Sequence, residues 1–281
     1  HLLSGLIVTP IAFLFYLRGY RFVVVSMRSI GDIAVLDAFI RENYLYKKTP
    51  RHKLFVAPAF PQVVNPYAYS LYKAHATILF STWSRLLLLP FFMNPFFKDD
   101  IYRFLGNDNY RAQKIKDGVQ WCRLQMNYAK YEDSFGSDPL INIKEKDVKK
   151  GWDIVKDYLQ PGEKYVALHV RDGGYYNDAG SIRSEKRNAD VFTYEAAIAY
   201  LISKNYKVVR MGDPYMVDIK SLLDKYGVGI FDYAKSDIKS DFMDCFLIAN
   251  SEFVIGSPSG LSPFASMFGK SLCLVNFFTA S

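Results

Sequence analysis

The sequence has few of the residues that build covalent or metal-held frameworks. It contains 3 cysteines and 4 histidines in 281 residues. Cys122, Cys245 and Cys273 form neither a CxxC pair nor an even set, so a disulfide scaffold and structural zinc both lack support. The histidines are scattered, without the close spacing of a helical metal site. We therefore expect no protein-bound metal and a reducing, cytoplasmic location.

Two familiar nucleotide-binding motifs are also missing. No Gly-Lys-Ser/Thr follows a glycine-rich turn, and no GxGxxG follows any predicted strand. The absence of these motifs disfavours both a kinase and a dinucleotide-binding protein.

Length and charge indicate the number of domains and the kind of partner. A chain of 281 residues suits two domains, and the loop signals in DSFGSDP (residues 133–139) predict domains over 1–138 and 139–281. The formal net charge of +7 favours an anionic partner, such as a nucleic acid, an acidic lipid or a nucleotide sugar. Lysine and arginine are dispersed and no nucleic-acid-binding motif occurs, so nucleic acid is the least favoured of the three.

The opening stretch is almost entirely apolar. Residues 2–17 contain Pro10, are followed by Arg18 and Arg21, and are slightly short for a membrane span. A buried helix and a membrane-surface anchor both remain open interpretations. Because the chain begins with His1 and ends after an apolar run, we expect a fragment of a longer protein.

Strands and helices alternate in the second half. Short loops join them, which predicts parallel βαβ units and a Rossmann-like domain. The first half, with a strand at 21–27, a helix at 32–44 and a strand at 53–57, indicates an irregular version of the same fold. A further helix is predicted at 110–131. The predicted strands of the second half are 165–170, 207–211, 229–232, 253–256 and 272–276, and the helices are 144–159, 194–204, 216–226, 241–250 and 261–268.

Polar residues and glycines collect after four consecutive strands of this half. Ligands bind at the carboxyl ends of parallel strands, so these residues are candidates for one binding site. Arg171 is the foremost candidate, because a planar guanidinium makes bidentate bonds to a diphosphate; a surface salt bridge is the alternative. His169 shares its strand face. The candidates at these strand ends are His169, Arg171, Asp172, Gly212, Asp213, Asp232, Ser257, Ser259 and Gly260.

Two other segments could contribute. The turn 257–260 precedes a predicted helix, whose first amides attract phosphate oxygens; simple capping by Ser259 is the alternative. Arg187 and Asn188 lie in a basic loop that could close over phosphates, although a solvated charge run has the same pattern. Lys239 and Ser240 lie at the start of another predicted helix. They too could contact phosphates or belong to a solvated charge run.

The first half has one compelling motif, RSIGD at residues 28–32. Gly31 permits a tight turn between strand and helix, and Gly31 and Asp32 are candidates for acceptor binding. Asp32 could cap the helix or act as general base on an acceptor hydroxyl, and the cap is the favoured interpretation.

Five motifs then carry a family resemblance over residues 144–281: HVRD, RNAD, RMGDP, DYAKSDIKSDFMD and GSPSGLS. In this order they resemble a family of bacterial glycosyltransferases associated with surface polysaccharides. The HxR element at His169 and Arg171 is also similar to that of GDP-fucose-dependent fucosyltransferases, which have the GT-B fold of two Rossmann-like domains. That resemblance implies that Arg171 contacts the donor diphosphate and that Asp213 and the turn 257–259 line the donor pocket.

The start of the chain resembles another family. Ser29-Ile30-Gly31-Asp32 looks like the beginning of the heptosyltransferases, in which the aspartate is the proposed base. The absence of a DxD sequence agrees with a metal-independent mechanism. The expected function is transfer of a sugar from a nucleotide diphosphate, GDP-linked by resemblance, to a glycan or lipid-linked acceptor, with no further cofactor. A non-catalytic nucleotide-sugar-binding partner of a polysaccharide assembly complex is the rival hypothesis.

Overall fold

The chain forms two compact units. The computed structural model describes residues 2–45, 53–58, 62–83, 91, 98–100, 130, 132–134, 136, 138–172 and 188–276. Unit 1 comprises His1–Leu140 with Ala280–Ser281, and unit 2 comprises Ile141–Thr279. The predicted helix at 110–131 falls almost wholly outside the described residues.

Unit 2 is built on a parallel sheet with the strand order β7-β6-β5-β8-β9. This is the doubly wound order, in which the chain first adds strands on one side of β5 and then switches to the other side at β8. The strands are β5 (Tyr165–His169), β6 (Lys207–Arg210), β7 (Ile230–Phe231), β8 (Phe253–Gly256) and β9 (Ser271–Leu274). The α-helices are α7 (Glu145–Val155), α9 (Glu195–Ser203), α10 (Lys220–Tyr226), α11 (Asp241–Ala249) and α12 (Ser262–Met267), with 3-10 turns η2 (Val191–Tyr194), η3 (Gly227–Gly229) and η4 (Tyr233–Lys235).

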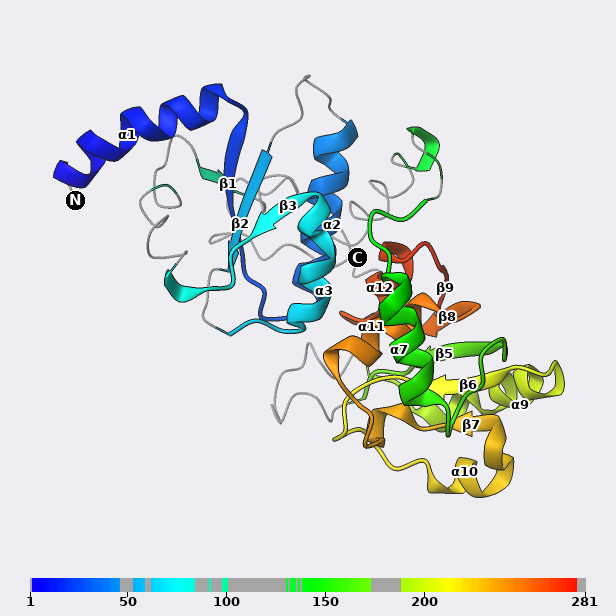
Figure 1. Ribbon diagram of the computed structural model, residues 1–281. Coiled ribbons are helices and arrows are strands. Elements are labelled where there is room, and N and C mark those ends of the chain that lie inside the picture. Colours follow the sequence, from blue (N-terminus) through cyan, green and yellow to red (C-terminus); the bar gives the residue numbers. More distant parts are fainter. Residues whose placement is uncertain are drawn as a thin grey trace. The chain divides into compact units, whose positions relative to one another are not determined.

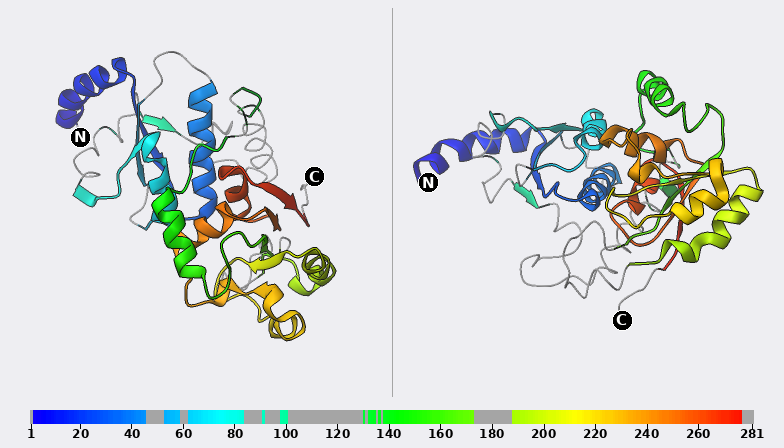
Figure 2. Two further views of the ribbon diagram at one scale, coloured as in Figure 1. Left: turned by 45° about the vertical axis from the view of Figure 1, so that its right-hand side comes forward. Right: turned by 90° about the horizontal axis from the view of Figure 1, so that it is seen from below.

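Helices cover both faces of this sheet, as Figures 1 and 2 show. On one face, buried Val166, Leu168 and Val208 pack against α9 and α10. On the other face α7 approaches α11 so closely that a Cβ on Gly151 would overlap the ring of Phe246. Burial on both sides explains why the central strands β5 and β8 are short apolar runs without polar alternation.

Unit 1 holds a smaller parallel sheet with the order β3-β2-β1-β4. Alternation along β1 places Val23 and Val25 in the core, while Phe22 stacks on Phe55 of β2 at 5.5 Å between ring centroids. Phe15 of α1 contacts the same aromatic cluster, with its centroid 6.4 Å from that of Phe22. The elements are α1 (Leu2–Leu17), β1 (Tyr20–Val25), α2 (Ile30–Leu45), β2 (Lys53–Pro58), α3 (Pro66–Ser70), η1 (Leu71–Ala74), β3 (Ala76–Ile78) and β4 (Lys98–Asp100).

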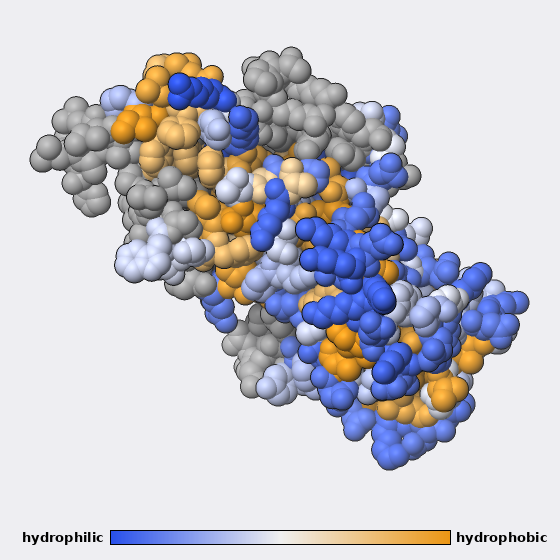
Figure 3. Space-filling model, viewed as in Figure 1, coloured by the Kyte–Doolittle hydropathy of each residue, from blue (hydrophilic) through white to orange (hydrophobic). Residues whose placement is uncertain are grey.

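The apolar opening stretch is helix α1, which projects from β1 in Figures 1 and 2. Figure 3 shows hydrophobic residues gathered over the described part of this helix, with hydrophilic residues beside its end. Across the part of the chain that the structure describes, no helix is long and apolar enough to cross a membrane.

Candidate functional site

The switch point of the unit 2 sheet lies between the carboxyl ends of β5 and β8. His169 pairs with Gly256 at the end of this ladder, and the Ser257 amide donates to the His169 carbonyl at 3.0 Å. Two residues farther along, the Arg171 amide donates to the Ser257 hydroxyl at 2.7 Å. Because Ser257 is completely buried, these bonds fix where the chain leaves β5 relative to the turn after β8.

Arg171 lies directly at this switch point. Its Nε donates to the Asn188 side-chain oxygen at 3.3 Å, and its carbonyl accepts from the Ala189 amide at 2.8 Å. Asn188 therefore lies beside Arg171, although 17 residues separate them in the sequence. The structure brings together three predicted donor residues, Arg171, Asn188 and Ser257, at the place where doubly wound folds bind ligands.

The serines of the turn after β8 use their hydroxyls within the protein. The Ser259 hydroxyl accepts from the Leu261 amide at 3.2 Å and lies 3.4 Å from the Ser262 hydroxyl. Ser262 donates to the Ser257 carbonyl at 2.7 Å. The following helix α12 begins at Ser262 and has six residues, so it starts later than predicted and presents only a weak dipole. Gly260 is the exposed residue of this turn.

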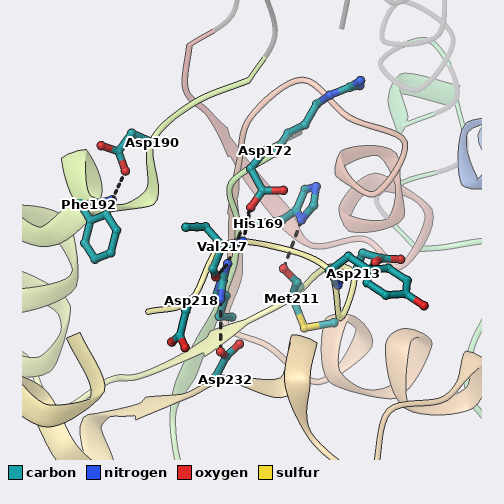
Figure 4. Close-up of polar contacts among 12 residues, drawn as sticks. His169, Asp172, Asp190, Phe192, Met211, Asp213, Val217, Asp218 and Asp232 are labelled. Carbon is teal, nitrogen blue, oxygen red and sulfur yellow. Dashed lines mark hydrogen bonds and ion pairs between the residues drawn. The ribbon is translucent and has the colours of Figure 1, made fainter. Parts of the chain in front are cut away.

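His169 is an uncharged hydrogen-bonding group. Burial lowers its pKa to about 4, despite a bond to the Met211 carbonyl that favours the charged form. That carbonyl can only accept, so Nδ1, 3.2 Å away, carries the proton and the other ring nitrogen is an acceptor. Figure 4 shows this contact. Gly212 follows with φ +142°, and a Cβ there would overlap the Met216 sulfur and lie 3.3 Å from His169 Nδ1.

A buried arginine holds two of the three acidic candidates of this edge. Arg210, at the end of β6, is 2% exposed, and its Nη1 donates to Asp232 at 3.2 Å. Its Nη2 donates to the Val217 carbonyl at 2.7 Å and lies 4.0 Å from Asp172, which accepts from the Val217 amide at 2.8 Å. Figure 4 shows Asp172 and Asp232 on either side of Val217. Asp172 and Asp232 thus have structural partners in place of a ligand.

Sequence reasoning did not place Arg210 among the site residues. The signal was available, since an arginine at the end of the apolar run KVVR shares a face with buried Val208. A charge there needs an opposite charge nearby, and Asp172 and Asp232 follow the two adjoining strands.

The other predicted donor residues make local contacts. Asp213 accepts from the Tyr215 amide at 3.0 Å in a side-chain turn. Lys239 forms an ion pair with Asp244 at 3.0 Å, and Ser240 caps α11 by accepting from the Met243 amide at 3.3 Å. Arg187 lies outside the described residues.

A groove of about 390 Å³ opens along the edge strand β7. Asp232 lines it, but Lys207, at the start of β6, and residues of η3 place most of it toward the amino end of the sheet. This groove is therefore separate from the edge that carries Arg171.

In unit 1, Asp32 closes the turn between β1 and α2. Its Oδ2 accepts from the Arg28 amide at 3.0 Å, the Ser29 amide at 2.9 Å and the Ser29 hydroxyl at 3.1 Å. The Asp32 amide donates to the Ser29 carbonyl at 3.0 Å. Asp32 is the third residue of α2, and its carboxylate accepts from the amide of Ser29, the residue before the helix, which is one half of a capping box. Gly31 is the second residue of α2, and Met27 before the turn is buried with φ +56°, a strained conformation for a methionine.

No group of three or more His, Cys, Asp or Glu side chains that could hold a metal ion occurs among the described residues.

No family model and no curated protein matches the sequence. Among solved structures, the chain is similar to a family 9 glycosyl transferase from Veillonella parvula, with a TM-score of 0.52 and 11% identity over 90% of this chain and 79% of that one. It is also similar to the ADP-heptose LPS heptosyltransferase II of E. coli, with a TM-score of 0.47 and 16% identity over 90% of this chain and 84% of that one. POFUT1 in complex with GDP-fucose gives a TM-score of 0.49 and 10% identity over 92% of this chain and 99% of that one.

At these identities the similarity shows the fold. The Veillonella structure is matched over most of the chain. Together with the two parallel sheets, this confirms the predicted α/β fold of GT-B type, with two Rossmann-like units.

Proposed function

We propose that this protein is a metal-independent glycosyltransferase that binds a nucleotide-diphosphate sugar in unit 2. In this proposal the acceptor, a glycan or a lipid-linked sugar, belongs to unit 1. The order of the HVRD, RNAD and GSPSGLS motifs supports a place in bacterial surface polysaccharide synthesis.

The observation that carries the proposal is the position of Arg171. Its main chain is fixed by Ser257 and Ala189, and its guanidinium lies beside Asn188 at the switch point of a doubly wound sheet. A preorganised cation at this point suits a diphosphate leaving group, because it need not reorganise as negative charge develops. The similarity to the Veillonella family 9 glycosyl transferase supports the same activity.

The chemistry assigned to these residues is simple. The acceptor hydroxyl attacks the anomeric carbon, the bond from that carbon to the diphosphate oxygen breaks, and the hydroxyl proton passes to a base. Arg171 stabilises the departing diphosphate by charge-assisted hydrogen bonds. Neutral His169 can accept a hydrogen bond from a donor hydroxyl but carries no charge toward the phosphates.

The first prediction concerns Asp32 as the base. Asp32→Asn is expected to lower turnover by about 10² to 10⁴-fold, the usual contribution of a general base. Asparagine can keep an oxygen toward the Arg28 and Ser29 amides, so folding and donor binding are expected to be unchanged. Turnover and donor affinity are measured on the same samples. Full turnover in Asp32→Asn would leave Asp32 a helix cap only.

One observation favours a second candidate function. The three hydrogen bonds that Oδ2 of Asp32 already accepts are those of a structural cap. A non-catalytic nucleotide-sugar-binding partner of a polysaccharide assembly complex would need the donor site of unit 2 and no base. Donor binding without release of nucleoside diphosphate, in the presence of acceptor extracts, would favour this candidate.

A thermal-shift screen tests donor binding and identifies the carrier. A ligand at about 100 times its Kd stabilises the folded state by about 2.7 kcal/mol, which raises Tm by about 5 to 10 °C for a unit of this size. We expect one base to stand out among GDP-fucose, ADP-heptose, UDP-glucose and the free diphosphates. The Arg171→Ala protein serves as the matched control and should show a smaller shift. No shift with any nucleotide sugar would contradict the proposed function.

A further inference from the structure

Helix α1 exposes an apolar face that the proposed activity does not use. Ile11 is 43% exposed, Phe13 48%, Leu14 53% and Leu17 64%. At about 100° per residue these side chains fall within an arc of about 160° centred opposite Ala12, which is completely buried. The helix is therefore held on one face and apolar on the other.

The inner face fixes the helix to unit 1. Phe15 packs edge-on against Tyr20, at 5.3 Å between centroids, and against Phe91, at 5.7 Å. A loosely attached terminal segment would not present a constant face, whereas these ring contacts orient the exposed arc of α1.

Positive charge and tyrosine rings surround the end of this helix. The Arg21 guanidinium lies 3.7 Å from the centroid of the Tyr16 ring, and the Lys53 ammonium lies 5.1 Å from that of Tyr20. Arg18 is exposed at the same end. Residues 1–31 contain no aspartate or glutamate.

We propose that α1 binds the surface of a bilayer that contains anionic phospholipid. An apolar arc enters the acyl boundary, and cations and tyrosines at its end lie at the level of the headgroups, where side chains with an apolar body and a polar tip are favoured. Charge decides between this partner and a second copy of the chain. A copy would offer an apolar arc with the same positive charge, whereas anionic lipid complements both features. This inference is independent of the proposed transferase activity.

Vesicle co-sedimentation of the whole chain tests it. The protein is expected to bind vesicles of phosphatidylcholine with phosphatidylglycerol and to bind pure phosphatidylcholine much more weakly. Leu14→Glu with Leu17→Glu should weaken binding by at least about tenfold, since it places two charges in the apolar arc. Both side chains are more than half exposed, so the substitutions should leave folding intact. Tyr200→Glu with Val228→Glu, at 63% and 87% exposure in unit 2, is the matched control and should bind like the unaltered chain.

Three outcomes would overturn the inference. They are no binding to anionic vesicles, equal binding by the α1 variant, and a dimer in analytical ultracentrifugation that the α1 variant dissociates while vesicles bind neither protein. The nucleotide-sugar thermal shift, measured on the same proteins, reports on unit 2. If the unaltered chain shows the nucleotide-sugar shift but does not bind anionic vesicles, this inference fails while the proposed function stands.

Discussion

Replacing Arg171 by alanine is expected to lower turnover by about 10² to 10⁴-fold. Each charge-assisted hydrogen bond to the diphosphate contributes about 1.5 to 3 kcal/mol, and a guanidinium can make two of them. The loss should be largest in kcat, because the charge on the leaving diphosphate grows in the transition state. The measurement is release of nucleoside diphosphate from the donor that the thermal-shift screen identifies.

The Arg171→Ala protein should remain folded. The bonds that fix this position, to the Ser257 hydroxyl and from the Ala189 amide, are made by the main chain and survive the substitution. The Arg171 side chain donates to Asn188 through a long bond of 3.3 Å. Arg171→Lys keeps the charge without the planar fork and should have an intermediate rate. Lys225→Ala, with a side chain 63% exposed in the same unit, is the control for loss of a cation. An unchanged rate in Arg171→Ala would remove the basis of the proposed donor site.

The sequence predicts the sheet of unit 2 well, because each strand is an apolar run bounded by turn residues. Phe253–Gly256 has the predicted bounds, and Tyr165–His169 is one residue shorter than predicted. These strands are buried on both faces, so their identity depends on local composition and hardly on tertiary partners. The candidate site at their carboxyl ends follows from the same parallel topology.

The helix predicted at 216–226 begins only at Lys220, so the first predicted turn is absent. Its absence could not be predicted from the local sequence. The Val217 amide is taken by Asp172 and its carbonyl by Arg210, from two other strands. These tertiary hydrogen bonds replace the ones that a first helical turn would make. No pattern within residues 213–220 reveals them.

Unit 1 was harder to predict for a related reason. Helix α3 and strand β3 lie in a segment crowded with proline and aromatic residues, where apolar periodicity carries little information. Asn65, buried with φ +44°, starts α3 by accepting from the Ala68 amide at 2.9 Å. Asparagine followed by proline is a recognisable helix start, but the burial of Asn65 depends on the surrounding packing.

The cluster around Arg210 is costly to bury and more costly to break. Burial raises the pKa of Asp232 even though the adjacent Arg210 charge lowers it, so desolvation outweighs the attraction. Arg210 Nε and Asp232 Oδ1 are also buried, and neither has a hydrogen-bond partner among the residues that the structure describes. Such a cluster adds little net stability compared with apolar residues, but loss of one member leaves the other charges uncompensated.

Arg210→Ala is therefore expected to destabilise the protein by about 3 to 5 kcal/mol, measured by urea unfolding. Arg210→Met with Asp232→Leu should lose less than Arg210→Ala alone, because the double change removes the buried carboxylate together with its partner. Lys220→Ala breaks an ion pair whose side chains are 75% and 62% exposed, and should leave the free energy of unfolding nearly unchanged. A loss below about 1 kcal/mol in Arg210→Ala would mean that water reaches Asp172 and Asp232 without the arginine. In that case these two acidic side chains would also be accessible to a ligand.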